Sequence, residues 1–214
     1  GPDKSEVWPV WNYRWQTLQT LKVPVRTNVQ ATTESIRTFN PDFIVLATGA
    51  QPQAAPLDTR QVEPSIATYH AWDVFENPSL VGSDSHVTII GAGMVGAELA
   101  DLLRLRGCHI RLLEMQSQAA IGMARNNKYE LLERLADSGV DLVTHCQITS
   151  IQGRTVMAIV KDMPTQFDVG DYLIFANGPK SNLDILQVVQ STGVMYECIG
   201  DCSKPGDFLT AIRD

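Results

Sequence analysis

The sequence has no excess of basic residues, no Cys-x-x-Cys pair and no uninterrupted apolar segment of membrane-spanning length. With 17 Lys and Arg against 24 Asp and Glu, its net charge of -7 argues against a broad phosphate-binding surface, so we expect no nucleic-acid partner. The longest apolar stretch, residues 87–103, is interrupted by three glycines, Glu98 and Asp101, and we expect no membrane partner.

Metal-ligand and hydrolase motifs are also missing. The spacings of the four cysteines fit neither a zinc site nor an iron–sulfur cluster, and no metal ligand is assigned. No signal-peptide pattern opens the chain, so we expect reduced thiols and a cytoplasmic protein. No catalytic side chain is assigned, because there is no Gly-x-Ser-x-Gly elbow and the histidines are scattered: His70, His86, His109 and His145.

The first 40 residues of this 214-residue chain predict a helix followed by a short strand and a polar connection or helical turn. Trp8, Trp11 and Trp15 recur at three- and four-residue steps and predict an amphipathic helix over residues 5–22. We expect the tryptophans to pack in a core, the alternative being a docking face for another protein. A strand over residues 23–29 and a short helical turn or polar connection over 33–40 should follow.

Two apolar runs end in the same pattern, Phe-Ile-Val-Leu-Ala-Thr-Gly at 43–49 and Tyr-Leu-Ile-Phe-Ala-Asn-Gly at 172–178. The first predicts a strand buried on both faces of a parallel sheet. Gly49 and Gly178 mark sharp turns at the ends of these two strands, and this suggests that an inserted domain lies between them. The prolines of residues 50–85 predict a crossing segment: Pro52, Pro56, Pro64 and Pro78.

Strand and helix patterns alternate over residues 86–144 and predict a βαβαβ unit. Its strands are expected at 86–90, 109–114 and 140–144, and its helices at 94–106 and 126–138. An antiparallel meander through 148–151 and 155–160 should then return to a buried strand at 172–176. The fold class is therefore α/β, a Rossmann-like three-layer domain with a β-meander.

The turn after the first of these strands is a complete Gly-x-Gly-x-x-Gly that opens the helix: Gly91, Ala92, Gly93, Met94, Val95 and Gly96. In this context the first glycine allows the tight turn, the second lets a pyrophosphate approach the backbone, and the third lets helix and strand pack closely. The amides of the helix start then provide an anion site.

An acidic residue, Glu114, ends the second strand about 20 residues beyond the glycines, where a carboxylate accepts hydrogen bonds from the adenosine ribose. Because a carboxylate repels a 2′-phosphate and no arginine follows directly, NAD(H) is favoured over NADP(H). Arg125, the nearest downstream candidate for a phosphate partner, keeps NADP(H) open.

Two further carboxylates have alternative interpretations. Glu98 lies in the first turns of the helix, where the helix dipole alone favours an acid. Gly200 and Asp201 come at the end of an expected strand, where the carboxylate either meets ligand hydroxyls or belongs to a plain turn. We expect the neighbouring Cys198 and Cys202 to be buried structural thiols.

Three segments together resemble the two-dinucleotide-binding-domain flavoproteins, and within them the NADH:flavin oxidoreductases related to 2,4-dienoyl-CoA reductase. The segments are Pro-Asp-Phe-Ile-Val-Leu-Ala-Thr-Gly-Ala at 41–50, residues 86–114 with Gly-Ala-Gly-Met-Val-Gly-Ala-Glu, and Ile-Gly-Asp-Cys at 199–202 with Ala-Ile-Arg-Asp at 211–214. In that family an FAD-binding domain is interrupted by an NAD(P)H-binding domain. The resemblance therefore implies a partial FAD-binding domain at 1–80 and 178–214, and an NAD(P)H-binding domain at 81–177.

The resemblance also implies roles for individual residues. Thr48 and Gly49 would lie beside the flavin dinucleotide, Gly178 would mark the second crossing, and Gly200 and Asp201 would hold the ribitol of FAD. Glu98 would approach the nicotinamide, and the Gly-x-Gly-x-x-Gly turn would take the NAD(H) pyrophosphate.

The family's first Gly-x-Gly-x-x-Gly, its FMN barrel and its cluster cysteines do not occur in this sequence. The expected partner is therefore the missing N-terminal part of the same enzyme, with FMN and an iron–sulfur cluster in those domains, and a homo-oligomer is left open. The implied function is hydride transfer from NAD(P)H to FAD, for reduction of an enoyl or enoate substrate or oxidation of an amine. The alternative is a non-catalytic adenine-nucleotide-binding structural module.

Overall fold

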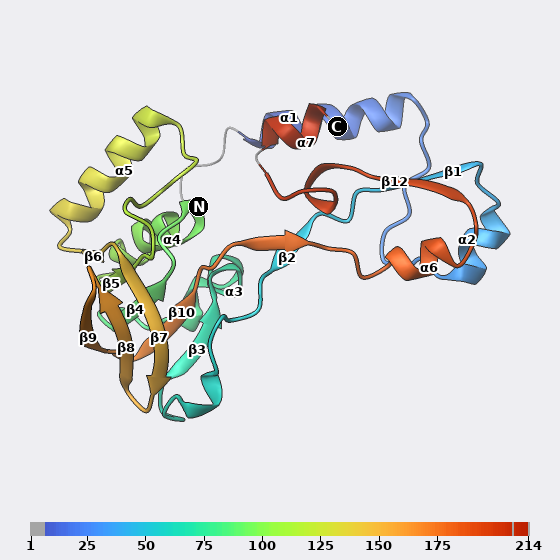
Figure 1. The fold of residues 1–214 in the computed structure, drawn as a ribbon. Coiled ribbons are helices and arrows are strands. Elements are labelled where there is room, and N and C mark those ends of the chain that lie inside the picture. Colours follow the sequence, from blue (N-terminus) through green and yellow to red (C-terminus); the bar gives the residue numbers. More distant parts are fainter. Residues whose placement is uncertain (1–6, 207, 214) are drawn as a thin grey trace. The chain divides into compact units, whose positions relative to one another are not determined.

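The computed structural model describes residues 7–206 and 208–213, which form two compact units (Figure 1). The central unit is Pro52–Gly178, and the flanking unit consists of the described residues before and after it. Ser5 and Glu6 of the expected first helix lie outside the described residues.

The central unit is built on a five-stranded parallel sheet with the order β3-β10-β4-β5-β6. The strands are β3 (Ala67–His70), β4 (His86–Ile90), β5 (His109–Leu113), β6 (Asp141–Val143) and β10 (Tyr172–Phe175). In β4 every residue after His86 is buried, as expected for a strand covered on both faces. The predicted βαβαβ unit is confirmed, with its helices at α4 (Met94–Arg104) and α5 (Arg125–Asp137).

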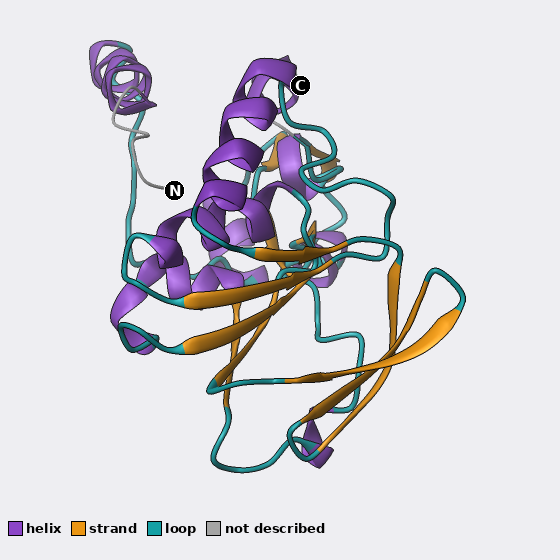
Figure 2. Cartoon of the chain, turned by 90° about the vertical axis from the view of Figure 1, so that its left-hand side faces the viewer, coloured by secondary structure: helices purple, strands orange, loops and turns teal. Residues whose placement is uncertain are grey.

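Helices and a meander cover the two faces of this sheet (Figure 2). On one face Leu99, Leu103 and Leu131 of α4 and α5 pack against strand residues such as Ile89 and Leu112. On the other face a second cluster includes Ile151, Val156 and Phe175. The antiparallel meander on this face consists of β7 (Cys146–Gln152), β8 (Thr155–Val160) and β9 (Met163–Asp168). The three-layer α/β fold class with a meander is thus confirmed.

Residues 50–85 do not form the predicted crossing segment. They contain β2 (Ala50–Pro52), η1 (Thr59–Gln61), β3, α3 (Ala71–Glu76) and η2 (Pro78–Leu80). Strand β3 pairs in parallel with β10, and Val74 and Val81 are fully buried in the core. Pro52 ends β2 and Pro78 starts η2, whereas Pro56 and Pro64 lie in a bend and a turn between elements, so the prolines interrupt the segment without keeping it from the core. The compact central unit accordingly begins at Pro52 rather than near residue 81.

The flanking unit contains α1 (Val7–Thr20), α2 (Thr33–Phe39), β1 (Phe43–Leu46), β11 (Pro179–Ser181), α6 (Leu186–Gln190), β12 (Met195–Cys198), η3 (Gly200–Cys202) and α7 (Phe208–Arg213). Strand β1 pairs in parallel with β12, and β11 pairs with β2. A small cluster around Leu46, Val189 and Cys202 forms the core. Thr32 caps α2 by accepting a hydrogen bond from the Ser35 amide.

Two expectations about the strands of this unit are wrong. Residues 23–29 have no strand, because this stretch contains Pro24 and pairs with no strand among the described residues. Strand β1 is not buried on both faces, since Phe43 and Val45 remain about half exposed at 47% and 54%. Its sheet has only two strands within the described residues, which leaves these side chains uncovered.

The tryptophans of α1 are not packed in a core, contrary to expectation. Trp8 and Trp11 are 64% and 54% exposed, although the helix itself forms as predicted. Their rings pack on each other instead: Trp11 stacks on Trp15 with centroids 5.9 Å apart, and Trp8 meets Trp11 edge to face. The helical spacing thus places the rings in contact with one another, but Trp8 and Trp11 remain exposed to solvent. The docking-face alternative stays a prediction.

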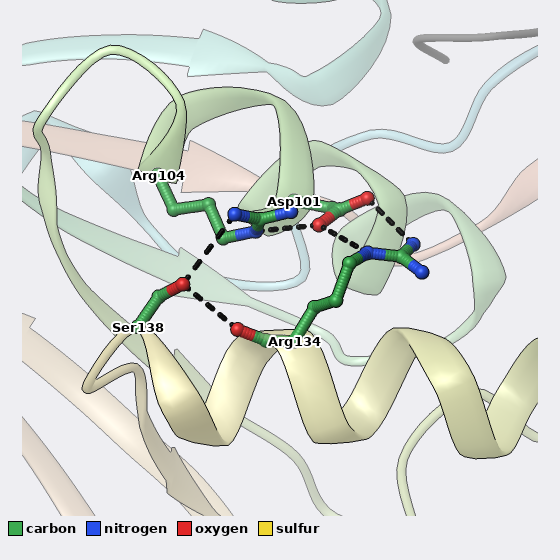
Figure 3. Close-up of polar contacts among 4 residues, drawn as sticks. All are labelled: Asp101, Arg104, Arg134 and Ser138. Atoms are coloured by element: carbon green, nitrogen blue, oxygen red, sulfur yellow. Dashed lines mark hydrogen bonds and ion pairs between the residues drawn. The ribbon is translucent and has the colours of Figure 1, made fainter.

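One ion-pair cluster joins α4 to α5 (Figure 3). The carboxylate of Asp101, which is 7% exposed, accepts from Arg104 Nε at 2.6 Å and from Arg134 Nη2 at 2.9 Å. Ser138 Oγ completes the cluster by donating to the Arg134 carbonyl at 2.8 Å. Burial acts to raise the pKa of Asp101, but the hydrogen bonds from Arg134 and Arg104 outweigh it and hold the pKa below its usual 3.8.

Replacing Asp101 with asparagine is expected to lower the free energy of unfolding by about 2 kcal/mol at pH 7, because both guanidinium groups lose their carboxylate. Since the folded-state pKa is lowered, the stabilisation is present above the unfolded-state pKa and disappears as the pH falls through the folded-state value. Urea unfolding between pH 7 and pH 3 measures the loss of stability and its dependence on pH. Asp58→Asn is the control, because Asp58 pairs with Arg60 on the surface. Equal effects of the two substitutions would contradict the expectation.

Candidate dinucleotide-binding site

The Gly-rich turn packs against the end of a neighbouring strand. It follows β4, and the Gly91 amide donates to the Leu113 carbonyl at 2.8 Å. Gly91 has a φ of +99°, and a Cβ there would lie 2.5 Å from the Ala176 carbonyl oxygen. A Cβ on Gly96 would overlap the Gly91 carbonyl. These two glycines are therefore required for close packing of turn, helix and sheet.

Gly93 differs from the other two glycines because its surroundings are open. A Cβ added to it would have no atom within 4 Å, and its φ of -61° is accessible to any residue. Gly93 is the N-cap of α4, whose first-turn amides have no partner within the helix. Ala92 is buried behind the turn, whereas Met94 is exposed and Val95 half-buried. The turn thus presents backbone donors at a point with room for an anion.

Glu114 is tied directly to this turn. Its side chain is buried, with Oε2 accepting from the Ala92 amide at 2.6 Å and Oε1 from the Gln116 amide at 2.8 Å. A carboxylate has about four acceptor positions, so these two bonds leave others for ligand hydroxyls. The structure therefore brings together the glycines and the acid that the sequence analysis singled out.

The remaining candidates of the central unit lie around the same edge. Glu98 is half-buried one turn further along α4, and Arg125 is exposed at the first position of α5. Gly178, at the other exit, has a φ of +89°, and its carbonyl accepts from the Gln53 amide at 3.1 Å. Asn177, which was not among the predicted site residues, donates from its side-chain amide to the Ala54 carbonyl at 2.9 Å. Its position between Ala176 and Gly178, in the Ala-x-Gly pattern, was the sequence feature that could have identified it.

The flanking unit brings the turn after β1 against η3. Thr48 Oγ1 donates to the Asn182 carbonyl at 2.6 Å and lies 3.2 Å from Cys202 Sγ. Gly49, with a φ of +72°, has nothing within 4 Å of a Cβ position. Asp201 Oδ1 accepts from the Gly206 amide at 3.0 Å. Asn182, which the sequence analysis did not identify, lies in a polar stretch with no motif to distinguish it.

Gly200 lies at the start of η3 and has a φ of +57°. A Cβ there would be 3.5 Å from the Ala211 side chain, so α7 packs beside it. Thr48, Gly49, Gly200 and Asp201 thus share one end of the β1–β12 pair, where backbone rather than bulky side chains lines the turns. This arrangement fits a nucleotide or flavin tail that approaches the main chain.

All four cysteines are free thiols in the structure; Cys108, Cys146 and Cys202 are buried, whereas Cys198 is only half-buried, contrary to expectation. Burial raises the pKa of Cys108 and Cys146, which keeps both in the unreactive thiol form. The described residues contain no group of three His, Cys, Asp or Glu side chains placed to hold a metal ion. Among the described helices none is long and apolar enough to cross a membrane.

A parallel α/β sheet with a glycine turn at one helix start and a strand-end glutamate bonded to it is the arrangement of the Rossmann-like dinucleotide-binding fold. The chain belongs to the pyridine nucleotide-disulphide oxidoreductase family, which it matches over residues 14–200. The Rossmann-like FAD/NAD(P)-binding fold of that family agrees with the architecture described above.

Individual proteins similar to the chain were also found. It is 28% identical to an NADH oxidase of Thermoanaerobacter brockii over 99% of its length and 33% of that protein. It is 30% identical to a bilirubin reductase of Mediterraneibacter gnavus (strain CC55_001C) over 100% of its length and 32% of that protein. A solved structure of 2-naphthoyl-CoA reductase superposes with a TM-score of 0.78 at 20% identity, covering 94% of this chain and 30% of that one. The chain thus spans about a third of the curated relatives described here.

Proposed function

We propose that the central unit binds NAD(P)H, with NADH preferred, and that the flanking unit contributes to an FAD site of a flavin-dependent oxidoreductase. The observation that carries the first part is the pairing of an open Gly93 with a buried Glu114 that is hydrogen-bonded to the same turn. The names NADH oxidase and bilirubin reductase, borne by two relatives, support a nicotinamide donor and a reductive reaction.

The residues present fit a dinucleotide. Gly93 leaves space at the start of α4, where amide donors and the positive end of the helix dipole favour a pyrophosphate. Glu114 holds acceptor positions for ribose hydroxyls, and its negative charge disfavours a 2′-phosphate. When bound, the nicotinamide supplies a hydride and the flavin accepts it, while the protein binds and orients them.

The flanking unit fits the tail of a flavin less completely than the central unit fits a dinucleotide. Gly49 and Gly200 provide positive-φ turns, and Asp201 keeps a second carboxylate oxygen for a ribitol hydroxyl beyond its bond to Gly206. Thr48 already donates to Asn182, so its role is to fix the turn. In this proposal the remainder of the FAD site comes from a part of the polypeptide outside this sequence.

The assignment of NAD(P)H to residues 81–177 and of FAD to 1–80 and 178–214 is therefore refined in our proposal to the two compact units, divided at Pro52 and Gly178. Within the NADH:flavin oxidoreductases related to 2,4-dienoyl-CoA reductase, FMN, an iron–sulfur cluster and the enoyl, enoate or amine substrate would belong to other domains of the enzyme. Homo-oligomer formation and a cytoplasmic location stay predictions.

Fluorescence titration of the 214-residue chain with NADH, NADPH and ADP tests the proposal. We expect NADH to bind at least about tenfold more tightly than NADPH, because the 2′-phosphate would meet the Glu114 carboxylate. Binding of neither nicotinamide nucleotide would refute it. ADP binding as tight as that of NADH, together with no flavin reduction by the complete protein, would instead support the adenine-nucleotide-binding structural module.

A further inference from the structure

A small recess lies at the carboxyl edge of the parallel sheet, next to the Gly-rich turn. His70 and Trp72 line it from the end of β3 and the start of α3, and Asn177 from the turn after β10. Val95 of the first turn of α4 closes one side. All of these residues belong to the central unit. The recess therefore joins the end of one strand to the same helix start that carries the anion site.

The register of the sheet places His70 in a defined row. Leu113 of β5 pairs with Ile90 of β4, Ile90 with Phe175 of β10, and Phe175 with His70 of β3. Glu114 directly follows Leu113, and Gly91 directly follows Ile90. His70 thus lies three strand positions from the strand that carries Glu114, a separation of about 14 Å at about 4.8 Å per strand.

The order of the strands determines the direction in which an extended dinucleotide would cross the sheet. A ribose at Glu114 lies over β5, and a pyrophosphate at Gly93 lies over β4. The second nucleoside must continue to the far side of β4, toward β10 and β3, because ligands of such sheets lie across the carboxyl ends of the strands. The recess at His70 is on that side, and Val95 and Phe175 are among the residues that line it.

The imidazole of His70 has the chemistry and the restraint needed to orient a carboxamide. The side chain is half-buried, and its ring lies 6.4 Å from the Phe175 ring at an angle of 49°. The backbone amide of His70 donates to Asp73 Oδ2 at 3.1 Å, which fixes the residue at the start of α3. A neutral imidazole offers one donor and one acceptor, which is the complement of a primary carboxamide.

We propose that His70 is a positioning residue for the nicotinamide end of the bound dinucleotide, hydrogen-bonded to its carboxamide. This inference rests on the proposed function, since it requires NAD(P)H in the central unit. His70 has no role in binding the adenosine half, which lies at Glu114 on the other side of β4. His86 and His109 serve no such purpose, because they stack on each other at 4.7 Å at the amino ends of their strands.

Calorimetric titration with NADH and with ADP-ribose, which lacks only the nicotinamide, tests the inference. His70→Ala should weaken NADH binding about tenfold, the loss of one hydrogen bond, and leave ADP-ribose binding within about twofold of wild type. His70→Asn keeps a donor and an acceptor and should restore most of the NADH affinity. His109→Ala, at the opposite edge of the sheet, should change neither affinity.

Retained ADP-ribose binding also shows that each variant is folded. The inference is overturned if His70→Ala leaves NADH binding unchanged, or if NADH and ADP-ribose affinities fall together. Failure of the wild-type chain to bind either compound would overturn the proposed function itself, and this inference with it. A His70→Asn variant no better than His70→Ala would refute the hydrogen bond to the carboxamide.

Discussion

Replacing Gly93 with aspartate is expected to weaken NADH binding by about 100-fold while leaving the fold intact or slightly more stable. Aspartate is a favoured N-cap residue, and a carboxylate suits the positive end of a helix dipole. The position has no atom within 4 Å of a Cβ and an ordinary φ, so the side chain fits. The same carboxylate occupies the anion site and repels a pyrophosphate, so binding and stability should change in opposite directions.

Two alanine variants, at Gly93 and Gly96, separate the effect of filling the ligand space from the effect of disturbing the packing of the turn. Gly93→Ala adds only a Cβ and should weaken NADH binding less than the aspartate does, with an unchanged melting temperature. Gly96→Ala should instead lower the free energy of unfolding by about 3 kcal/mol, because its Cβ would overlap the Gly91 carbonyl and the backbone would have to shift. Thermal unfolding and NADH titration of all three variants provide the measurements. A Gly93→Asp protein that binds NADH normally would exclude this turn as the pyrophosphate site.

Substitution of Glu114 is expected to have the second largest effect on NADH binding. Alanine and glutamine at this position should change different properties of the protein. Glu114→Ala leaves the buried Ala92 amide without its acceptor and should lower the free energy of unfolding by about 2 kcal/mol. It should also weaken NADH binding by about tenfold or more, since ribose hydroxyls lose their acceptor. Denaturant unfolding and fluorescence titration measure the two losses separately.

Glu114→Gln removes the negative charge together with one of the two oxygens that accept backbone amides. Glutamine keeps one oxygen for a backbone amide but no longer repels a 2′-phosphate, so the preference for NADH over NADPH should narrow by about fivefold or more. Glu133→Gln, on the exposed side of α5, removes the same charge away from the site and should leave the preference unchanged. An equal shift in both variants would mean that net charge, and not the strand-end position of Glu114, sets the preference.

The candidate site of the central unit was largely predictable because its signals are local. A strand, a Gly-x-Gly-x-x-Gly turn and a helix follow one another within residues 86–104, in the order that the motif requires. Glu114 needed only the next strand of the same unit. The bond from Ala92 to Glu114 was not predictable, because it depends on the pairing of β4 with β5 and the exact height at which both strands end.

His70 and Asn177 show what local patterns leave out. Both come at the ends of strands whose partners are distant in sequence, β3 with β10 across about 100 residues and β10 with β4 across more than 80. The prolines of residues 50–85 favoured a linker, and only the pairing of β3 revealed that this segment belongs to the central sheet. The residues that line the recess could therefore not be grouped from the sequence.

The sequence by itself determined the α/β class, the Gly-rich turn at a helix start and the acid at the end of the next strand, because strand and helix periodicity and turn chemistry act between residues close in the chain. The tertiary structure alone decided that β3 completes the sheet, that the α1 tryptophans contact each other rather than a core, and that Asp101 joins two helices. Burial, strand register and ion pairing are relations between distant segments, and their free energies exist only once the chain has folded.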